Sequence, residues 1–582
     1  MNYYCFTLLL VLLMSMASTK AFAYDIAVQN EDGVTIYYNY INNFTELEVT
    51  AKEIKEQGDY YESWGYEGVK TLKIPAEVTY SGRMRKVTRI GANAFCGMEL
   101  YYDFYLPQTE YRGAFIECIY LPSTITSIGE DAFRYYYKVF SQTGSKNRPT
   151  KLKKVVINDL KSFLEISGKH NLFYFPVSNY VSTGYDLCLN NENNVITDID
   201  VPAGIKDLYG LRACKSIERL TIGNDVETVR EWEGCTNLKK VDLQGLNNTE
   251  MMYEAFYLCK IDTLIIGGNL KKLGGSVFGG SVENYVIKDL DSWLNMEVGY
   301  GFNNCAFGTK AYSYTYQIIG RFHILNDEGR EIDNLVIPDD ITVVNPFAFN
   351  NLACVKKITI PANVEFSQSK IYGNVLTGTF QLCEDLESVV IDGIEEIHSK
   401  MFMGCSKLKN ISWGNCIKTI GSYAFFNCGM TKLSLPEGVN IIGYGCFCNC
   451  PLKSVVIPSS VTSIGESAFS TDELTTVIPL FVENIPDAGT SNYNAFSYNT
   501  LINNATLYVP EGTVDKYKST IGWKDFVWIE EGTPSGIDST RPDNDKTEVS
   551  RYTLDGKKLS EPQKGINIIK MSDGSTKKEI VK

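Results

Sequence analysis

Three cysteines at alternate positions, Cys446, Cys448 and Cys450, are the side chains whose type and spacing best suit a metal ion. Thiolates bind zinc, and a structural zinc site needs four ligands. Cys446, however, stands where Ala424 and Ala468 stand in the neighbouring stretches of sequence. Only Cys448 is then unexplained, because Cys450 belongs to a repeated position described below. We therefore predict no metal site and no cofactor.

Histidines and paired carboxylates are the other candidates for chemistry. His323 lies in a strand-like stretch, His170 in a polar loop, and His398 at a position that glycine holds elsewhere. None stands near a nucleophile, phosphate-binding or dinucleotide-binding motif. Adjacent carboxylates such as Glu395 and Glu396 have no predicted cleft around them. The sequence predicts no enzyme, although a carboxylate pair assembled from distant segments would leave no trace in it.

The start of the chain predicts export. Residues 6–16 form an apolar run too short to span a bilayer, and Ala21-Phe22-Ala23 follows as a small-residue cleavage site. Residues 1–23 are interpreted as a signal peptide, and no later stretch is apolar enough for a transmembrane segment. The 55 basic and 69 acidic residues give a net charge of -14, which argues against nucleic acid as a partner. We predict a secreted or outer cell-surface protein.

The elements that would position any site are internal repeats. A chain of 582 residues would ordinarily contain several globular domains, but the repeats predict one elongated domain instead. An apolar strand position recurs in steps of 21 to 23 residues. One array comprises Val201, Ile222, Leu243, Ile266 and Ile287, and another comprises Ile391, Trp413, Leu435, Ile457 and Ile478. With further copies, about fifteen repeats can be counted between residues 69 and 531.

Each repeat predicts one coil of a stack. Val455 and Ile457 share one face of a strand by period two, and Pro458 ends the strand because it has no amide hydrogen. Gly465 is interpreted as a turn residue with positive φ, and Phe469 as a core side chain. One coil cannot bury its own apolar face, so coils must stack. We expect a single monomeric rod on the order of 70 Å long at the usual strand spacing.

The best-kept copy, CPLKSVVIPSSVTSIGESAF at residues 450–469, resembles the BspA-like leucine-rich repeat of surface proteins from anaerobic gut and oral bacteria. The resemblance implies an α/β, strand-dominated leucine-rich repeat solenoid over residues 69–531, in coils of 21–24 residues. It also implies a non-enzymatic surface protein of Bacteroidota, adhesin-like, that binds host matrix protein or other bacteria.

The ends differ from the repeats. Residues 24–68 alternate as strands and are similar to the small β-cap that begins such proteins. Residues 532–550 are rich in Pro, Asp and Ser and are interpreted as a linker. The sequence RYTLDGKKLSEPQKGINIIK within residues 551–582 is similar to the C-terminal sorting domain of Bacteroidota proteins exported by the type IX system. A plain β-hairpin appendage also fits its alternation.

Insertions rich in Tyr interrupt the repeat near residues 98–118, 165–198 and 297–330. The sequences DLKSFL at residues 159–164 and DLDSWL at residues 289–294 introduce the second and third of them. This similarity indicates a duplicated block.

Half of the sixteen cysteines fall in one position of the repeat, three residues after its apolar anchor. They are Cys214, Cys235, Cys259, Cys305, Cys383, Cys405, Cys428 and Cys450. A small polarizable side chain in one repeated position predicts a structural ladder of buried, free thiols. Disulfides between adjacent ladder positions are the alternative, since neighbouring coils lie within the distance that a bridge spans.

Two groups of residues are candidates for a binding surface. The outward strand positions are small or β-branched: Thr359, Val390, Ser412, Ser434 and Val456. The second group is tyrosine in the interruptions: Tyr101, Tyr102, Tyr105, Tyr135, Tyr136, Tyr137, Tyr300, Tyr312, Tyr314 and Tyr316. Tyrosine offers a large apolar face and a hydroxyl at low entropic cost. A protein ligand at the strand face and a glycan on the tyrosines are the two predicted partners, and simple packing of the insertions on the coils is the alternative.

Overall fold

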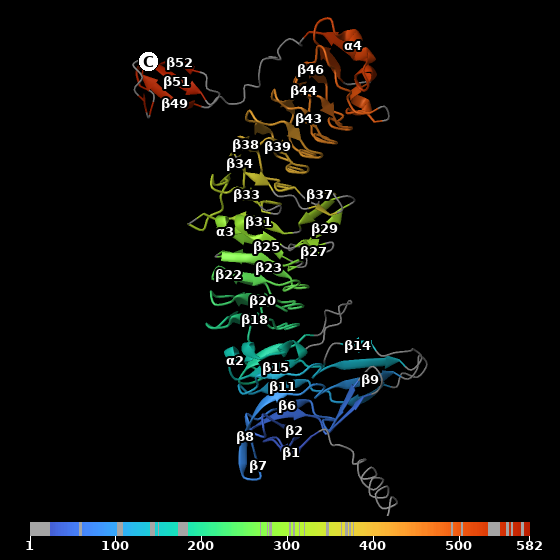
Figure 1. Cartoon of the computed structure of the whole chain (residues 1–582), viewed down its shortest axis with the longest axis vertical. Coiled ribbons are helices and arrows are strands. Elements are labelled where there is room, and N and C mark those ends of the chain that lie inside the picture. The colour runs from blue at the N-terminus through green and yellow to red at the C-terminus, as the bar shows by residue number, and fades with distance from the viewer. Residues whose placement is uncertain are drawn as a thin grey trace, which may run out of the picture. The chain divides into compact units, whose positions relative to one another are not determined.

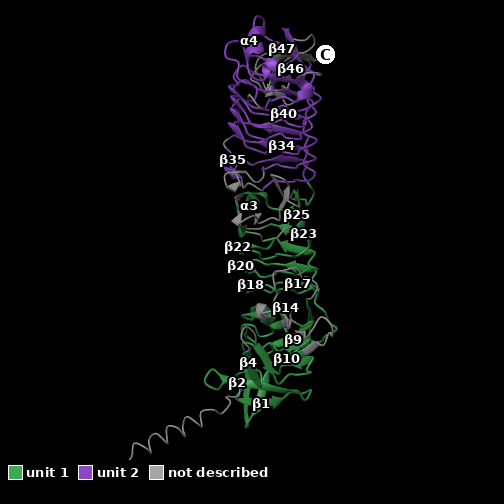
Figure 2. Cartoon of the chain, turned by 90° about the vertical axis from the view of Figure 1, so that its right-hand side faces the viewer, with its two compact units in different colours: residues 1–331 green, residues 332–582 purple. Residues whose placement is uncertain are grey.

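The structure is a computed structural model in which strands dominate. It describes residues 24–581 except for 57–60, 102–108, 140–145, 149–150, 173–183, 268, 276, 279–281, 299, 302–303, 306–308, 313–314, 319, 327, 345–347, 363, 367–369, 372–373, 376–377, 491–492, 502–504, 533–547, 554–557, 560, 562 and 572–575. The chain divides into unit 1, which ends at Glu331, and unit 2, which begins at Ile332 (Figure 2). Within the described residues, no helix is both long enough and apolar enough to cross a membrane.

Unit 1 begins with a sheet in which hairpin strands continue into the repeats. In spatial order its strands are β1 (Ile26–Gln29), β2 (Thr35–Ile41), β3 (Glu46–Thr50), β8 (Arg83–Ile90) and β12 (Ser127–Ile128), with β7 (Glu77–Tyr80) also paired to β8. The pairs β1–β2 and β2–β3 are antiparallel, whereas β3–β8 and β8–β12 are parallel. A separate hairpin joins β4 (Glu53–Glu56) to β5 (Tyr61–Trp64). Residues 24–68 therefore supply the first strands of a sheet that the repeats extend.

Parallel sheets form the repeated face of unit 1 (Figure 1). The first sheet contains β6 (Thr71–Lys73), β11 (Cys118–Leu121), β15 (Lys154–Ile157) and β16 (Asp186–Leu189). The second contains β17 (Asp198–Asp200), β19 (Arg219–Thr221), β21 (Lys240–Leu243), β23 (Ile261–Ile266), β25 (Val282–Ile287) and β31 (Arg321–Ile324). A further parallel sheet contains β18 (Asp207–Tyr209), β20 (Thr228–Arg230), β22 (Asn247–Met251), β24 (Asn269–Leu273) and β26 (Glu297–Val298). Each coil thus contributes to two columns of strands.

Unit 2 repeats this arrangement. Its main strands are β32 (Asn334–Val336), β34 (Lys357–Ile360), β38 (Ser388–Ile391) and β40 (Asn410–Ser412) in one sheet, and β42 (Lys432–Ser434), β44 (Ser454–Ile457), β46 (Thr476–Pro479), β47 (Thr506–Val509) and β48 (Trp528–Glu531) in another. The second column contains β33 (Val343–Val344) with β35 (Glu365–Phe366), and β39 (Glu396–Ile397), β41 (Thr419–Ile420), β43 (Ile441–Ile442) and β45 (Ser463–Ile464). Helix α4 (Val514–Ser519) and the 3-10 helix η3 (Trp523–Asp525) cover the last coil with the buried rings of Tyr517 and Trp523.

The core of unit 2 contains a stack of phenylalanine rings. It comprises Phe349, Phe380, Phe402, Phe425, Phe447, Phe469 and Phe496, one from each successive coil. Adjacent ring centroids lie 5.2 to 5.7 Å apart, and the planes of the first six rings are tilted by 10° or less from one to the next. The repeated Phe is therefore the residue that sets the contact between one coil and the next.

The turn after β45 requires a glycine, but the reason is not the positive φ that was predicted for it. Gly465 does not have a positive φ; in its turn the left-handed residue is Ser467, with φ of 57°. A Cβ on Gly465 would lie 2.6 Å from the amide nitrogen of Tyr444 in the preceding coil. Gly443 stands in the same relation to Ser422. Glycine is needed there because the backbones of adjacent coils approach each other closely.

The duplicated block consists of a short capped helix and a returning strand. Helices α2 (Leu160–Glu165) and α3 (Leu290–Asn295) each begin after an Asp N-cap, whose carboxylate accepts a hydrogen bond from the serine amide three residues later. The chain then returns to form β16 beside β15, and β31 beside β25. The insertions predicted at residues 165–198 and 297–330 thus each contain a strand of the parallel sheet. Strand β31 contains the strand-like stretch predicted around His323, whereas β16 was not predicted, because it does not end in the Ile-Pro of the regular coil.

Two further positions correct the sequence analysis. Ile457 pairs with Pro479, not with Ile478, which lies opposite Val456 and is 1% exposed. The run of three apolar residues from Val477 does not define which of them faces inward.

At the C-terminal end, β49 (Glu548–Thr553) begins within the predicted linker and forms an antiparallel sheet with β50 (Lys558–Leu559), β51 (Gly565–Met571) and β52 (Thr576–Val581).

Candidate binding surface

The strand face of unit 2 places its predicted outward residues in register. Thr359 pairs with Val390, and Val390 pairs with Ser412. In the next sheet, Ser434 pairs with Val456. Ser412 is exposed and the other four side chains are half-buried, while their neighbours in the strands alternate into the core. We call these five residues the strand face.

One residue of this face was missed. Val336 pairs directly with Thr359 and is 53% exposed, which is high for a large apolar side chain. It lies between the buried Leu335 and Ile337. The alternation of the segment Leu335-Val336-Ile337-Pro338 could have identified it, since every second residue of such a strand faces outward.

The corresponding face of unit 1 is charged. A cavity of about 210 Å³ lies over β17, β19 and β21, and charged side chains make up much of its lining. These include Asp198, which forms an ion pair with Arg219, and Asp200, Lys240 and Asp242. The outward positions of these first strands are thus not all of the small or β-branched kind predicted for unit 2. The two units therefore present chemically different strand faces.

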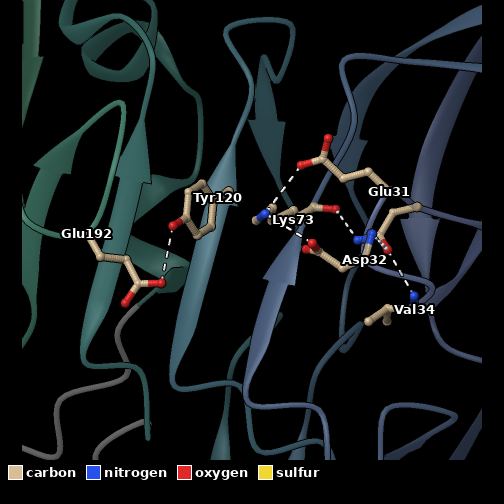
Figure 3. A network of polar contacts seen from close by, with 7 residues as sticks. Glu31, Asp32, Val34, Lys73, Tyr120 and Glu192 are labelled. Atoms are coloured by element: carbon tan, nitrogen blue, oxygen red, sulfur yellow. Dashed lines mark hydrogen bonds and ion pairs between the residues drawn. The ribbon is translucent and has the colours of Figure 1, made fainter.

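Near the start of unit 1, loops cover the strand face. Glu192 accepts a hydrogen bond from Tyr120, at 3.2 Å, and the Lys73 ammonium lies 5.5 Å from the centre of the Tyr120 ring (Figure 3). Lys73 Nζ also contacts Glu31 and Asp32, at 3.3 and 3.1 Å, and these bonds raise the pKa of the lysine. Turns from both sides thus occupy the outward face of β6 and β11.

Two of the candidate tyrosines near the first interruption belong to the core. Strands β9 (Gly97–Tyr101), β10 (Thr109–Gly113), β13 (Tyr135–Val139) and β14 (Lys146–Arg148) form one sheet, in which Tyr101 pairs with Val139 and Tyr137 with Glu99. Tyr135 and Tyr136 are only 3% and 1% exposed, so the structure removes both from the candidate binding surface. Tyr136 packs on Cys96 and Met98, and the Tyr135 ring contacts Phe115. Tyr102 and Tyr105 lie outside the described residues.

The tyrosines of the third interruption lie in two small hairpins. Tyr300 begins β27 (Tyr300–Gly301), which pairs with β28 (Asn304–Cys305). Tyr312 ends β29 (Thr309–Tyr312), which pairs antiparallel with β30 (Thr315–Ile318), the strand that contains Tyr316. Tyr314 lies outside the described residues. Another small hairpin joins β36 (Lys370–Ile371) to β37 (Asn374–Val375) in unit 2.

The cysteine ladder lies behind the strand faces. Cys214, Cys235, Cys259, Cys383, Cys405, Cys428 and Cys450 are all buried and free. Cys305 differs because it lies in the hairpin strand β28, and its side chain is outside the described residues. From Cys383 onward, each ladder thiol donates a hydrogen bond of 3.1 Å to the carbonyl of the stacked Phe in the preceding coil. Cysteine therefore supplies a buried backbone carbonyl with a hydrogen-bond donor that a methyl group in the same position could not supply.

Burial makes these thiols poor nucleophiles. Desolvation raises the pKa of Cys450 to about 12 and that of Cys214 to about 11, and it raises the pKa of Cys405 well above its usual value. Reactivity requires the thiolate and access to it. Cys416 is exposed, and Cys354 and Cys448 are half-buried.

We expect a thiol reagent at pH 8 to label Cys416 rapidly in the folded protein and to leave the ladder cysteines unlabelled until denaturant is added. Mass spectrometry of tryptic peptides after timed labelling would measure this, and Cys416→Ser should remove the fast phase. Because the folded-state pKa of Cys450 is raised, its labelling should stay slow as the pH rises to 9. Rapid labelling of Cys428 or Cys450 without denaturant would contradict the ladder.

The groups considered first for chemistry are Cys446, Cys448 and the histidines. Cys446 is buried, Cys448 is half-buried, and burial raises the pKa of both thiols. In the part of the chain that is described, no three His, Cys, Asp or Glu side chains are grouped so as to hold a metal ion. His323 Nδ1 lies 2.6 Å from Glu331 Oε1, and its Nε2 lies 3.1 Å from Asn284 Oδ1, so both ring nitrogens are engaged.

Comparisons with known proteins point to one family. The model of the BspA type leucine-rich repeat region matches six copies, at residues 76–150, 188–284, 326–377 and 374–503. Among solved structures, the chain is similar to a leucine-rich repeat protein from Bacteroides ovatus (15% identity, TM-score 0.37, covering 88% of this chain and 100% of that one). It is also similar to a leucine rich cell surface protein from Faecalibacterium prausnitzii (19% identity, TM-score 0.32, covering 80% of this chain and 99% of that one). A third similar structure is the pneumococcal vaccine antigen PcpA (15% identity, TM-score 0.33, covering 88% of this chain and 100% of that one). No curated protein matches the sequence.

Proposed function

Because the chain belongs to the BspA type leucine-rich repeat family, we propose that it is a non-enzymatic, adhesin-like binding protein whose strand face in unit 2 receives a protein partner. The observation that carries this proposal is the row of Thr359, Val390 and Ser412, paired in register and uncharged. Small, β-branched or hydroxyl side chains lose little rotamer freedom and little hydration when a partner covers them. A repeat protein offers such a surface without having to fill it.

A binding array tests the proposal. The full chain is probed against extracellular matrix proteins, surface proteins of other bacteria and polysaccharides, and each hit is repeated with Val390→Lys and Ser412→Arg. Both substitutions place a long cation on the strand face without touching the core. We expect a protein hit that each variant weakens at least about tenfold, which corresponds to the loss of one well-packed contact.

Ser459→Arg is the matched control, because Ser459 is exposed in the turn that follows β44 and lies off the strand face. It should leave binding unchanged. A protein partner that binds both strand-face variants as tightly as the parent would place the interaction elsewhere. Polysaccharide hits without any protein hit would overturn the proposal.

A second candidate function is capture of glycans by the tyrosine hairpins. It is favoured by the position of Tyr300, Tyr312 and Tyr316 in hairpins β27–β28 and β29–β30, outside the parallel sheets. Aromatic rings pack on the apolar faces of sugars, and a tyrosine hydroxyl can bond to theirs. Glycan hits that Tyr300→Ala and Tyr312→Ala abolish would support this function over the first.

Export completes the proposal. We infer that residues 1–23 are removed as a signal peptide, and that residues 551–582 are a sorting tail of the kind used by Bacteroidota to bring proteins to the outer surface. The antiparallel sheet of β49 to β52, which shares no strand pairing with the repeats in the described residues, supports a separate role for this tail. A monomeric chain released or retained at the cell surface is the expected product, and fractionation of cells with and without residues 551–582 would test it.

A further inference from the structure

Two exposed tyrosines flank a carboxylate on consecutive turns of unit 2. Tyr444, Glu466 and Tyr493 each stand three residues before a stacked phenylalanine of their coil, namely Phe447, Phe469 and Phe496. The centroids of these phenylalanine rings are 5.7 and 5.5 Å apart. Tyr444 is 43% exposed and Tyr493 66% exposed. The buried stack therefore belongs to the same three coils as these side chains, and Tyr493 lies in the turn between Gly489 and Asn494 of the last of them.

Hydrogen bonds join the three positions directly. The amide of Gly445 donates to the carbonyl of Glu466 at 2.9 Å, which places the turn of Tyr444 beside Glu466. On the other side, Thr490 Oγ1 donates to Glu466 Oε1 at 2.7 Å and accepts from the amide of Tyr493 at 3.2 Å. Glu466 is thus oriented by the same threonine that fixes the turn of Tyr493. We call Tyr444, Glu466 and Tyr493 the tyrosine platform.

A third ring extends the platform. Tyr423 lies on the coil before Tyr444, and the two ring centroids are 5.2 Å apart in an edge-to-face contact. Tyr423 also lies over Gly445, where a Cβ would be 2.9 Å from its ring. Burial and the hydrogen bond with Tyr444 raise the pKa of Tyr423 to about 12. This packing restricts the Tyr444 ring before any ligand arrives, which lowers the entropic cost of binding.

We propose that the tyrosine platform binds an uncharged, extended polysaccharide chain. The axial C–H groups of a pyranose present an apolar face that packs on an aromatic ring, and tyrosine supplies such rings with a hydroxyl at the edge. Coil spacings of 5.7 and 5.5 Å are comparable to the length of one sugar unit, so successive coils meet successive sugars. Tyr444 and Tyr493, two coils apart, would then stack on every second sugar.

The carboxylate selects the charge of the ligand. Glu466 Oε2 accepts no hydrogen bond from any of the described residues, which leaves it to accept from a sugar hydroxyl. The position three residues before the stacked Phe holds Ser422, Tyr444, Glu466 and Tyr493, with no cation. An anionic polysaccharide would be repelled by Glu466, whereas a neutral one would gain a charge-assisted hydrogen bond. Neutral sugars are therefore the class that these groups fit.

This surface differs from the strand face. The strand face lies on β34, β38, β40, β42 and β44, whereas Tyr444 and Glu466 follow β43 and β45 in the second column of strands (Figure 1). It also differs from the tyrosine hairpins of unit 1, because all of its residues belong to unit 2. Failure of either proposal leaves the other open to its own test.

The experiment uses the full chain and three probes: a soluble uncharged β-linked glucan, a soluble uncharged α-linked glucan, and polygalacturonate as the anionic comparison. Isothermal titration calorimetry measures affinity, with affinity electrophoresis as a second readout. We expect one of the two uncharged glucans to bind and polygalacturonate not to bind. Tyr444→Ala and Tyr493→Ala should each weaken binding roughly tenfold, as expected for one aromatic contact. The double variant should abolish it, and Glu466→Gln should weaken it several-fold.

Tyr498→Ala is the matched control, since Tyr498 is 73% exposed on the same unit but lies outside the platform. It should bind as the parent does. The three tyrosines are exposed and Glu466 is half-buried, and unchanged thermal unfolding would show that all variants are folded. Three results would overturn the proposal: no binding of either uncharged glucan, unchanged binding by the double variant, or tighter binding of polygalacturonate.

Discussion

Phe425→Ala is expected to lower the free energy of unfolding by about 3–5 kcal/mol, the usual cost of removing a buried aromatic ring. Phe425 is fully buried and stacks between Phe402 and Phe447, with centroid distances of 5.2 and 5.3 Å. The rings of Trp413 and Phe425 also pack edge to face, with their centroids 5.6 Å apart. Alanine would leave a cavity and separate the two halves of the ring stack. Strand pairing holds the backbones of the neighbouring coils in place, so little relaxation can fill the space.

Denaturant unfolding followed by tryptophan fluorescence would measure this loss, and Trp413 reports on the same coils. Phe425→Leu, which keeps much of the volume, should cost less than Phe425→Ala. Ile441→Ala is the surface control, because Ile441 is 43% exposed and its truncation should change stability by no more than about 0.5 kcal/mol. A loss below about 1 kcal/mol for Phe425→Ala would show that the stack does not hold the coils together.

Gly210→Ala should destabilise unit 1 by about 3 kcal/mol, although it adds a single methyl group. Gly210 follows β18, and its amide donates to the carbonyl of Arg230 in the next coil at 2.7 Å. A Cβ at this position would overlap the carbonyl of Glu231 and the amide nitrogen of Trp232. These are backbone atoms of the adjacent coil, so no side chain can move aside. The coils must separate locally, or the hydrogen bond must break.

Gly223→Ala is the matched control in the same unit. Gly223 has no left-handed φ, and a Cβ there would meet nothing within 4 Å. Alanine should be neutral or slightly stabilising at that site, since it restricts the unfolded chain. The melting temperatures of the two variants are compared with that of the parent. A loss in Gly210→Ala alone would show that crowding between coils, and not the replacement of a glycine as such, destabilises the protein. Equal melting temperatures for both variants would refute the close-approach explanation.

The regular coils could be predicted in detail because the repeat carries its own register. The period of the repeat predicted the alternation of inward and outward side chains around Val390, Ser412 and Val456 that the structure has. It failed at Ile478, where three successive apolar residues hide the alternation. It also assigned a positive φ to Gly465, because a glycine in a turn suggests backbone freedom, whereas here the close approach of another coil requires it.

The candidate surfaces were less predictable. Exposure of a tyrosine depends on what folds over it, and Tyr135 and Tyr136 are buried because β13 lies against β9 and both of its faces are covered. Tyr444 and Tyr493 were not singled out, since one lies in a regular coil and the other beyond the last well-kept copy. Both stand three residues before a stacked Phe. This shared sequence separation can be read from the sequence, but its importance is evident only once the ring stack is known.

By itself, the sequence determined the family, the spacing of the coils, the residues that face the core and the positions of most ladder cysteines. These follow from local periodicity, because each coil contacts mainly its neighbours. Only the tertiary structure decided which faces remain open: the turn of Glu192 covers β11, while Thr359, Val390 and Ser412 are left partly uncovered. Such coverage depends on contacts between residues far apart in the chain, and no local pattern encodes them.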